Sequence, residues 1–274
     1  MVLPDVQNSE DTRGVKLDKV GICDYQIPFA VFNKDGSVQS TVGTASVYTS
    51  LDPEVKGANM SRYSQIIEKA IQKKMSMSAI VDMLDILQTK LEARESYAKI
   101  KFPFFIKKKA PVSGVESHAY YICTFEGRNT EKKGRQLFME VRAQYTSLCP
   151  CSKQMSLVTE AAGEGAHNQR SECIVTVSLK DWGNETLWIE DLVQLIEEEA
   201  SCPIWNSLKR PDEKYVTERA YKNPKFVEDV ARDVSLRLDK VTSINGFTIV
   251  VQHFESIHQS NAVCIKRGGS VYIP

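Results

Sequence analysis

Residues 147–153 read Ser-Leu-Cys-Pro-Cys-Ser-Lys, and residues 165–170 read Gly-Ala-His-Asn-Gln-Arg. These segments bring Cys149, Cys151 and His167 close together in the chain, and zinc and similar metals prefer thiolate and imidazole ligands. The proline between the cysteines cannot continue a strand or a helix, so we expect the thiols where an element ends. Two reduced cysteines beside a surface histidine would give the same pattern. A metal site with so few protein ligands would leave a position open for water, as catalytic sites do.

The composition indicates a soluble globular protein with reduced thiols. The chain has 274 residues, 42% of them hydrophobic and 26% charged, which is enough for one large domain or two modules. Its 35 basic and 35 acidic residues give a formal net charge of zero, which argues against binding nucleic acid through bulk charge. Residues 1–7 lack the features of a secretory signal, and no stretch approaches the roughly 18 apolar residues of a membrane span. We therefore expect a cytoplasmic protein with no membrane partner, whose seven cysteines are reduced.

The first half of the chain predicts strands, then two helices, then further strands. The Asp-Gly pair at 35–36 predicts a hairpin turn, because glycine adopts positive φ at little cost. One helix is expected to begin with Ser61 as its cap, and a second covers residues 78–94 with Ser78 as its cap. Pro103 predicts a sheet edge or a bulge. The expected strands are Val15–Ile22, Pro28–Phe32, Val38–Tyr48, Lys99–Ile106, Ala119–Phe125 and Gln136–Thr146.

The second half predicts the order strand, helix, helix, strand. The segments are Glu172–Leu179, Trp188–Ala200, Phe226–Leu238 and Ile244–Glu255, with a last short strand at Ser270–Pro274. No Gly-x-Gly-x-x-Gly or phosphate-loop motif occurs, so the sequence supports neither a Rossmann nor a P-loop nucleotide site. The two halves therefore have a similar α+β build, although no residue-level repeat relates them.

Two further groups of side chains have the chemistry of a catalytic or binding site. A turn after Glu255 would bring it beside His258, and a carboxylate next to an imidazole can tune the ring for proton transfer. A surface histidine near a glutamate would give the same short pattern. Cations that suit phosphate are spread over Lys153, Arg170 and the charge-dense segment 208–219, although scattered surface lysines and arginines are the plainer interpretation.

With these residues in place, the sequence resembles the prokaryotic type IB GTP cyclohydrolase I family over nearly the whole chain. The resemblance rests on several long motifs in the same order, which are Leu3–Gln7, Asn59–Arg62, Ser147–Lys153, Gly165–Arg170, Lys209–Glu218 and Glu255–His258. It implies an α+β tunnelling fold (T-fold) with two antiparallel-sheet modules, each with paired helices, at residues 1–146 and 147–274. Chains of this fold assemble into barrels with active sites between subunits, so the resemblance also implies a homo-oligomer, expected to be a tetramer.

The implied reaction converts GTP and water to formate and 7,8-dihydroneopterin triphosphate, the first step of folate (tetrahydrofolate) biosynthesis. The implied cofactor is a divalent metal ion, zinc or manganese. The resemblance gives roles to eight side chains, which are Cys149 and His167 as metal ligands, Glu255 and His258 as a proton-transfer pair, Glu218 as the guanine anchor, and Ser61, Arg62 and Lys153 as triphosphate contacts. Among these, Cys149 is the residue on which catalysis is expected to depend first.

Three departures from the family pattern concern the site. Asn59 stands where the family has histidine before Met-Ser-Arg, and Pro203 stands where some members have a glutamate ligand. Glu199 could replace that ligand by a local shift. The loop before His167 carries an apparent insertion at residues 160–164. The resemblance therefore leaves the third metal ligand and the part played by Cys151 open.

Two other functions fit the same residues. A nitrile reductase of this fold would act on a deazapurine with NADPH and use the cysteine as a covalent nucleophile. A non-catalytic metal-binding assembly protein would close the coordination with four ligands and no water. Pro150 and His167 beside the thiol favour metal ligation over covalent chemistry, and consumption of NADPH would distinguish the reductase.

Overall fold

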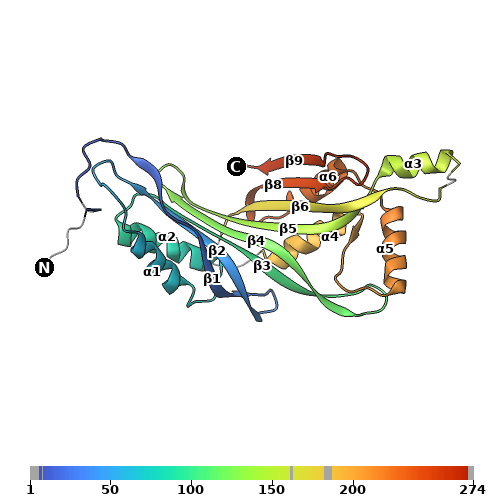
Figure 1. Cartoon of the computed structure of the whole chain (residues 1–274), viewed down its shortest axis with the longest axis horizontal. Helices are drawn as coiled ribbons and strands as arrows, with labels where there is room; N and C mark the ends of the chain where they lie inside the picture. Colours follow the sequence, from blue (N-terminus) through green and yellow to red (C-terminus); the bar gives the residue numbers. More distant parts are fainter. Residues whose placement is uncertain (1–5, 8, 161–162, 182–186, 271–274) are drawn as a thin grey trace. The chain divides into compact units, whose positions relative to one another are not determined.

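The chain folds around one β-sheet, which confirms the expected α+β class. The structure is a computed structural model that describes residues 6–7, 9–160, 163–181 and 187–270 (Figure 1). Within these residues the sheet has nine strands in the order β1-β2-β3-β4-β5-β6-β8-β9, and β7 pairs with β5. The strands are β1 Leu17–Phe32, β2 Val38–Leu51, β3 Ser96–Lys109, β4 Glu116–Thr130, β5 Gly134–Leu148, β6 Asn168–Leu179, β7 Cys202–Pro203, β8 Ile244–His253 and β9 Ala262–Gly269. The helices are α1 Met60–Ala70, α2 Met77–Leu91, α3 Pro150–Val158, α4 Ile189–Glu199, α5 Arg210–Lys222 and α6 Val227–Leu238.

The chain divides into two compact units. The first comprises Met1–Pro103, Thr124–Met139 and Asp181–Glu185, and the second comprises Phe104–Cys123, Glu140–Lys180 and Thr186–Pro274. The long strands β3, β4 and β5 each contribute residues to both units. These units are defined by contacts within the chain and not by a structural similarity between its two halves. The predicted division into modules at residues 1–146 and 147–274 therefore stays a prediction.

In the first unit, the predicted hairpin and the two predicted helices are confirmed, but both caps differ. Strands β1 and β2 are antiparallel and meet across a turn where Gly36 has φ of 82°. Ser76, rather than Ser78, caps α2, because its hydroxyl accepts a hydrogen bond from the Ala79 amide at 3.3 Å. Asn59 precedes α1 without a side-chain cap, and the Ser61 hydroxyl donates to the Asn59 side-chain oxygen at 2.6 Å. Ser61 is therefore a first-turn residue, and its predicted role as the cap is wrong.

Pro103 lies in an interior strand, so the sheet edge, one of the two predicted alternatives, is wrong, and the bulge stays a prediction. Strand β3 lies between β2 and β4 in the sheet order. Its pairing with β2 runs from Ser96 to Lys101 and ends before the proline, which has no amide to donate. The Pro103 carbonyl still accepts a hydrogen bond, at 2.8 Å, from the Thr41 hydroxyl.

In the second unit, α4 and α6 pack together, and α6 covers β8 and β9. Both helices were predicted, but α3, α5 and β9 were not. Helix α5 is densely charged, and only Asp212 and Ala220 of its residues are buried, so it lacks an apolar stripe. Residues 271–274 of the expected last strand lie outside the described residues, and the chain has left strand β9 before Ser270.

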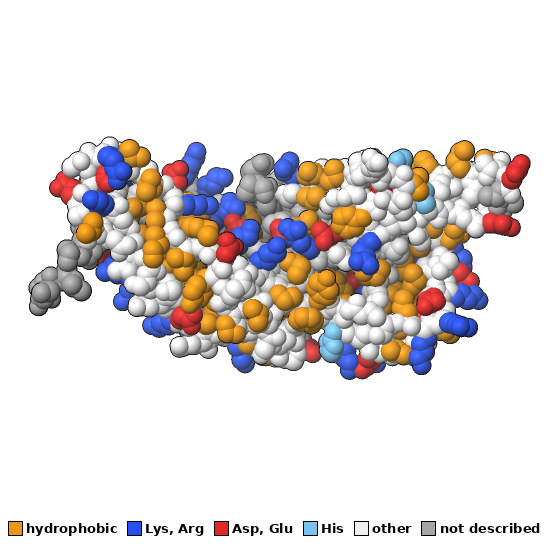
Figure 2. Space-filling view, viewed as in Figure 1, with side chains coloured by type: hydrophobic (Ala, Val, Ile, Leu, Met, Phe, Trp, Pro, Cys, Tyr) orange, Lys and Arg blue, Asp and Glu red, His pale blue; other side chains and the backbone are white. Residues whose placement is uncertain are grey.

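The described surface carries both signs of charge. Lysine and arginine side chains are interspersed with aspartate and glutamate on the face drawn in Figure 2, as a formal net charge of zero leads one to expect. Among the described residues, no helix is both long enough and apolar enough to cross a membrane.

Candidate active site

A cavity of about 340 Å³ in the second unit collects half of the predicted site residues. Its wall includes Cys149, His167, Glu255 and His258, four of the eight side chains to which the resemblance gave roles. Cys151 lines the same cavity. The residues come from the end of β5, the start of α3, the segment before β6 and the loop after β8, so only the fold brings them together.

Cys149 lies at the junction between strand β5 and helix α3. The following proline occupies the first turn of α3, where its missing amide costs no hydrogen bond. The Cys149 sulfur accepts a hydrogen bond from the Ser152 amide at 3.4 Å, and the Cys149 amide donates to the His167 carbonyl at 3.1 Å. The thiol therefore lies where an element ends, as predicted, but a helix follows it instead of the expected loop.

The His167 ring is oriented by a chain of buried polar groups. Its Nδ1 lies 3.2 Å from the Gln169 side-chain oxygen, and the Gln169 amide nitrogen donates to the Ser147 hydroxyl at 3.0 Å. Ser147 in turn lies 2.8 Å from the Ser171 hydroxyl. Because the amide nitrogen of Gln169 is used in this way, its oxygen faces the ring and accepts from Nδ1–H. Nε2 then keeps its lone pair for a metal, which is how partners outside the coordination shell orient histidine ligands.

The side chains that line this cavity are of the types that bind zinc and similar divalent metal ions. A thiolate and an imidazole are the donors that zinc-like ions prefer, and the Cys149 and His167 backbones are hydrogen-bonded to each other. Within the described ranges, no three His, Cys, Asp or Glu residues lie close enough to form a complete metal-binding group. Two donors would hold the ion with positions open for other ligands.

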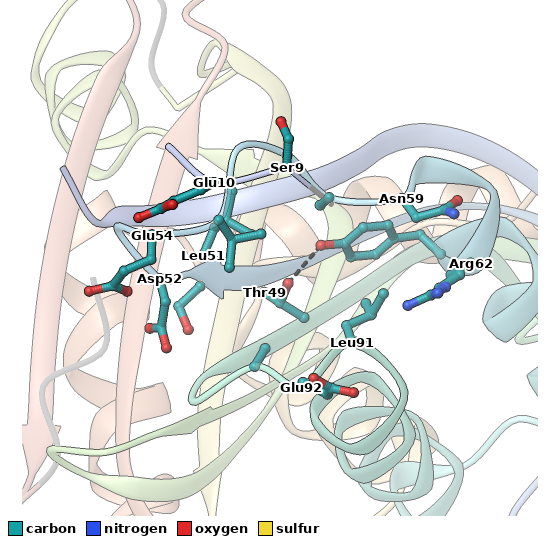
Figure 3. A pocket seen from close by; sticks show the side chains of 16 residues that line it. Ser9, Glu10, Thr49, Leu51, Asp52, Glu54, Asn59, Arg62, Leu91 and Glu92 are labelled. Carbon is teal, nitrogen blue, oxygen red and sulfur yellow. Dashed lines mark hydrogen bonds between the residues drawn. The ribbon is translucent and has the colours of Figure 1, made fainter. Parts of the chain in front are cut away.

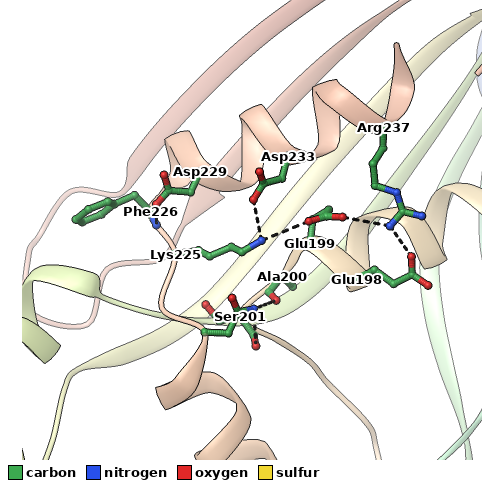
Figure 4. A network of polar contacts seen from close by, with 10 residues as sticks. Glu198, Glu199, Ala200, Ser201, Lys225, Phe226, Asp229, Asp233 and Arg237 are labelled. Atoms are coloured by element: carbon green, nitrogen blue, oxygen red, sulfur yellow. Dashed lines mark hydrogen bonds and ion pairs between the residues drawn. The ribbon is translucent and has the colours of Figure 1, made fainter. Parts of the chain in front are cut away.

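The structure argues against Glu199 as a replacement ligand. Pro203 lies in β7, where it pairs with Tyr145, and it supplies no carboxylate. The Glu199 carboxylate lies 3.4 Å from the Lys225 ammonium and 3.3 Å from the Arg237 guanidinium (Figure 4). Glu199 also does not line the cavity. Its two cationic partners therefore hold it away from the candidate metal site.

Glu255 and His258 reach the same cavity because β8 ends earlier than the sequence predicted. The strand stops at His253 rather than Glu255, and the chain then follows a loop to β9. Along a continued strand, residues three apart would face opposite sides of the sheet. In the described chain the two residues line the same cavity wall, and no hydrogen bond joins the Glu255 carboxylate to the His258 ring.

His253 also lines the cavity, and the sequence gave no reason to select it. Its side chain is 3% exposed, and its Nε2 lies 3.2 Å from the Tyr145 hydroxyl. Burial penalises the imidazolium and lowers the pKa of His253 from 6.5 to about 4. His253 is therefore neutral near pH 7 and presents an uncharged ring to the cavity.

We expect His253 to make folding stability depend on pH. The unfolded chain binds the proton near pH 6.5 but the folded chain only near pH 4, so the free energy of unfolding falls as the pH drops through this window. The loss should be about 2–3 kcal/mol between pH 7 and pH 4.5. Urea unfolding of the wild type and His253→Gln at both pH values would measure it. An equal loss in the non-titrating variant would contradict the assignment.

Lys153 and Glu218, two more predicted residues, lie outside the cavity. The Lys153 ammonium donates to the Tyr221 carbonyl at 2.6 Å and lies 4.6 Å from the centre of the Tyr221 ring. Glu218 lies on α5 with half of its side chain exposed, and it pairs with Lys214 at 3.7 Å and Lys222 at 4.0 Å. Glu218 is therefore free to change partners, whereas Lys153 fastens α3 to the end of α5.

A buried carboxylate fixes the start of α5, the helix that carries Glu218. Asp212 is fully buried and accepts hydrogen bonds from the amides of Val112, Ser113 and Lys209, each at 2.8 Å. Burial by itself raises the pKa of the Asp212 carboxyl, but the Ser113 hydroxyl and these amides outweigh it and hold the pKa below its usual range. These hydrogen bonds therefore fix the first turn of α5, the helix on which Glu218 lies.

Ser61 and Arg62 belong to the first unit, where Arg62 lines a separate cavity of about 640 Å³ (Figure 3). Asn59 lines it too, together with Asp52, Glu54 and Glu92. Tyr63 and Thr49 also line this cavity, and their hydroxyls lie 2.6 Å apart in a buried contact that ties α1 to β2. Asn59 thus occupies the cavity wall at the position where the resemblance led us to expect histidine.

The comparisons with known proteins identify the family of this chain. A family model described as type I GTP cyclohydrolase folE2 matches residues 3–264. The chain is 45% identical over 263 residues to the GTP cyclohydrolase FolE2 of Azoarcus sp. (strain BH72), which covers 96% of this chain and 94% of the relative. It is 44% identical over 263 residues to the FolE2 of Fervidobacterium nodosum, with 95% of each covered.

Solved structures support the fold alone. Urate oxidase from Bacillus subtilis 168 superposes with a TM-score of 0.54 over 92% of this chain and 98% of the oxidase, at 6% identity. The uricase from Arthrobacter globiformis gives a TM-score of 0.53 over 92% and 93%, at 5% identity. The fold is the tunnelling fold of these oxidases, and by sequence the chain belongs to the type I GTP cyclohydrolase FolE2 family.

Proposed function

We propose that this protein is a GTP cyclohydrolase that converts GTP and water to 7,8-dihydroneopterin triphosphate and formate, the first step of folate biosynthesis. The observation that supports this most strongly is the shared cavity. Cys149, His167 and the pair Glu255 and His258, which come from three separate segments of the chain, all line it. Membership of the FolE2 family over nearly the whole chain supports the same reaction.

Cys149 and His167 hold a divalent metal ion, zinc or manganese, in this proposal. Such an ion, when bound, supplies Lewis acidity that makes water a nucleophile at neutral pH. The chain's own contribution is orientation. The Ser152 amide holds the Cys149 sulfur, and Gln169 leaves His167 Nε2 free to ligate. No covalent bond to Cys149 is needed for this chemistry, and no observation favours the reductase or the non-catalytic protein.

Glu255 and His258 move protons. Carbon 8 of a purine is electrophilic only when the ring is polarised, so N7 must gain a proton as water attacks. Ring opening and release of formate then need further proton transfers to nitrogen. An imidazole that exchanges protons with a nearby carboxylate suits this sequence, and both side chains line the cavity with direct access to solvent at His258.

The remaining roles describe substrate binding in an assembled protein. Glu218 accepts hydrogen bonds from the guanine ring N–H and amino group, while Ser61, Arg62 and Lys153 contact the triphosphate.

Two modules, residues 1–146 and 147–274, combine in a barrel built by a cytoplasmic homotetramer, with each active site between subunits. The exposed position of Glu218 supports this arrangement, because a carboxylate that reads guanine must be covered by another surface.

GTP turnover by metal-stripped protein tests the proposal. We expect no product without metal, and fluorescent pterin after oxidation once Zn²⁺ or Mn²⁺ is added. Parallel assays with NADPH should show no consumption of the cofactor. Folded protein that forms no pterin with any divalent ion would overturn the proposed reaction and would point to Asn59 and Pro203 as the cause.

A further inference from the structure

Lys225 lines the candidate metal cavity but has no role in the reaction described above. It lies in the segment 223–226, which joins α5 to α6. Its side chain is 13% exposed, and its ammonium lies 2.8 Å from Asp233 and 3.4 Å from Glu199. Figure 4 shows the ammonium between these two carboxylates, which come from α6 and the end of α4.

The surrounding charges make Lys225 a poor anchor for a phosphate. Glu199 also pairs with Arg237, which in turn pairs with Glu198. Three carboxylates therefore face two cations in this cluster, so it offers no net positive charge to an anion. Because both carboxylates beside Lys225 are fixed on helices, the ammonium holds the linker in place instead.

The backbone of Lys225 connects that linker to the metal-binding segment. Its amide donates to the Leu148 carbonyl at 3.1 Å, and the Leu148 amide donates to the Ser201 hydroxyl at 3.3 Å. The next amide, that of Cys149, donates to the His167 carbonyl. The peptide that presents the thiol is thus held from three separate segments of the chain.

We infer that Lys225 is a positioning residue, whose ion pairs to Asp233 and Glu199 hold the linker so that its amide fixes Leu148 and aims the Cys149 thiol into the cavity. This inference rests on the proposed function only in one respect, which is that a divalent metal ion is what binds the Cys149 thiol. The hydrogen-bonded geometry itself belongs to the metal-free chain. Partners of this kind, which hold a ligand in place, typically contribute about 10- to 100-fold to metal affinity.

The first test measures amide hydrogen exchange in the metal-free protein. Lys225→Met keeps the aliphatic stem but removes the ion pairs, so exchange over the segment around Leu148 and Cys149 should accelerate. Lys225→Arg should restore slow exchange, and Lys240→Met, an exposed control beyond α6, should match the wild type. Unchanged exchange in Lys225→Met would overturn the inference whatever reaction the protein catalyses.

The second test titrates the same proteins with Co²⁺ and follows absorption from thiolate to cobalt. We expect about 10- to 100-fold weaker binding and a weaker thiolate band for Lys225→Met only. Unchanged cobalt affinity with a raised KM for GTP would instead make Lys225 a phosphate ligand and overturn the inference. If Lys225→Met does not fold, Asp233→Asn, which leaves the Glu199 pair, should shift exchange and affinity in the same direction by less. Failure of GTP turnover in the wild type would count against the reaction alone.

Discussion

Replacing Cys149 by alanine is expected to remove both bound metal and GTP turnover. The change removes one of the two proposed metal ligands, Cys149 and His167. Both line the cavity, and their backbones are hydrogen-bonded to each other. Without the ion, the attack on the purine loses several kcal/mol of stabilisation, so turnover should fall by about 10³-fold or more. The fold should survive, because the hydrogen bond from the Ser152 amide is the one that the sulfur accepts among the described residues, and losing such a cap costs about 1 kcal/mol.

Metal content after gel filtration, measured together with pterin formation, checks this expectation. Cys264→Ala is the matched control, since Cys264 is a free, partly exposed thiol on β9 outside the cavity. Cys151→Ala adds information, because its thiol lines the cavity and its part in ligation is open. A Cys149→Ala protein that keeps full metal content and full activity would refute the assignment.

The elements that the sequence predicted well are those with a strong local signal. Helices α2, α4 and α6 carry apolar stripes that face the core, and the hairpin between β1 and β2 has an Asp-Gly turn. Strand β9 has no such signal, because all its described residues are exposed or only partly buried. It forms through its pairing with β8, which runs from Gly246 opposite Gly269 to His253 opposite Ala262. Sequence periodicity does not reveal such pairing.

The same distinction separates the site residues. Thiols, imidazoles and carboxylates are conspicuous in short motifs, so Cys149, His167, Glu255 and His258 could be selected from the sequence alone. Gln169 and Lys225 act through contacts with residues far away in the chain, and glutamine or lysine at such positions is unremarkable by itself. Their roles follow only from the fold, which brings the ends of β5, α4 and α5 to one place.

Replacing Glu218 by glutamine is expected to remove guanine recognition without disturbing the fold. Its carboxylate presents two acceptors to the ring N–H and the amino group of guanine, whereas an amide presents one acceptor and one opposing donor. Sites built to pair polar groups reject a mismatched partner by about 10⁴-fold, so kcat/KM for GTP should fall on that scale. Stability should hardly change, because the pairs of Glu218 with Lys214 and Lys222 are exposed and worth about 0–1 kcal/mol.

Comparing GTP with inosine triphosphate, which lacks the amino group, isolates the contact made by Glu218. The wild type should prefer GTP strongly, and Glu218→Gln should lose most of that preference, while Glu213→Gln, which changes another exposed glutamate of α5, should keep it. Equal discrimination in Glu218→Gln and the wild type would remove Glu218 from guanine binding. Because Asp212 fixes the start of α5 in all three proteins, a change confined to Glu218→Gln reports on the side chain and not on a displaced helix.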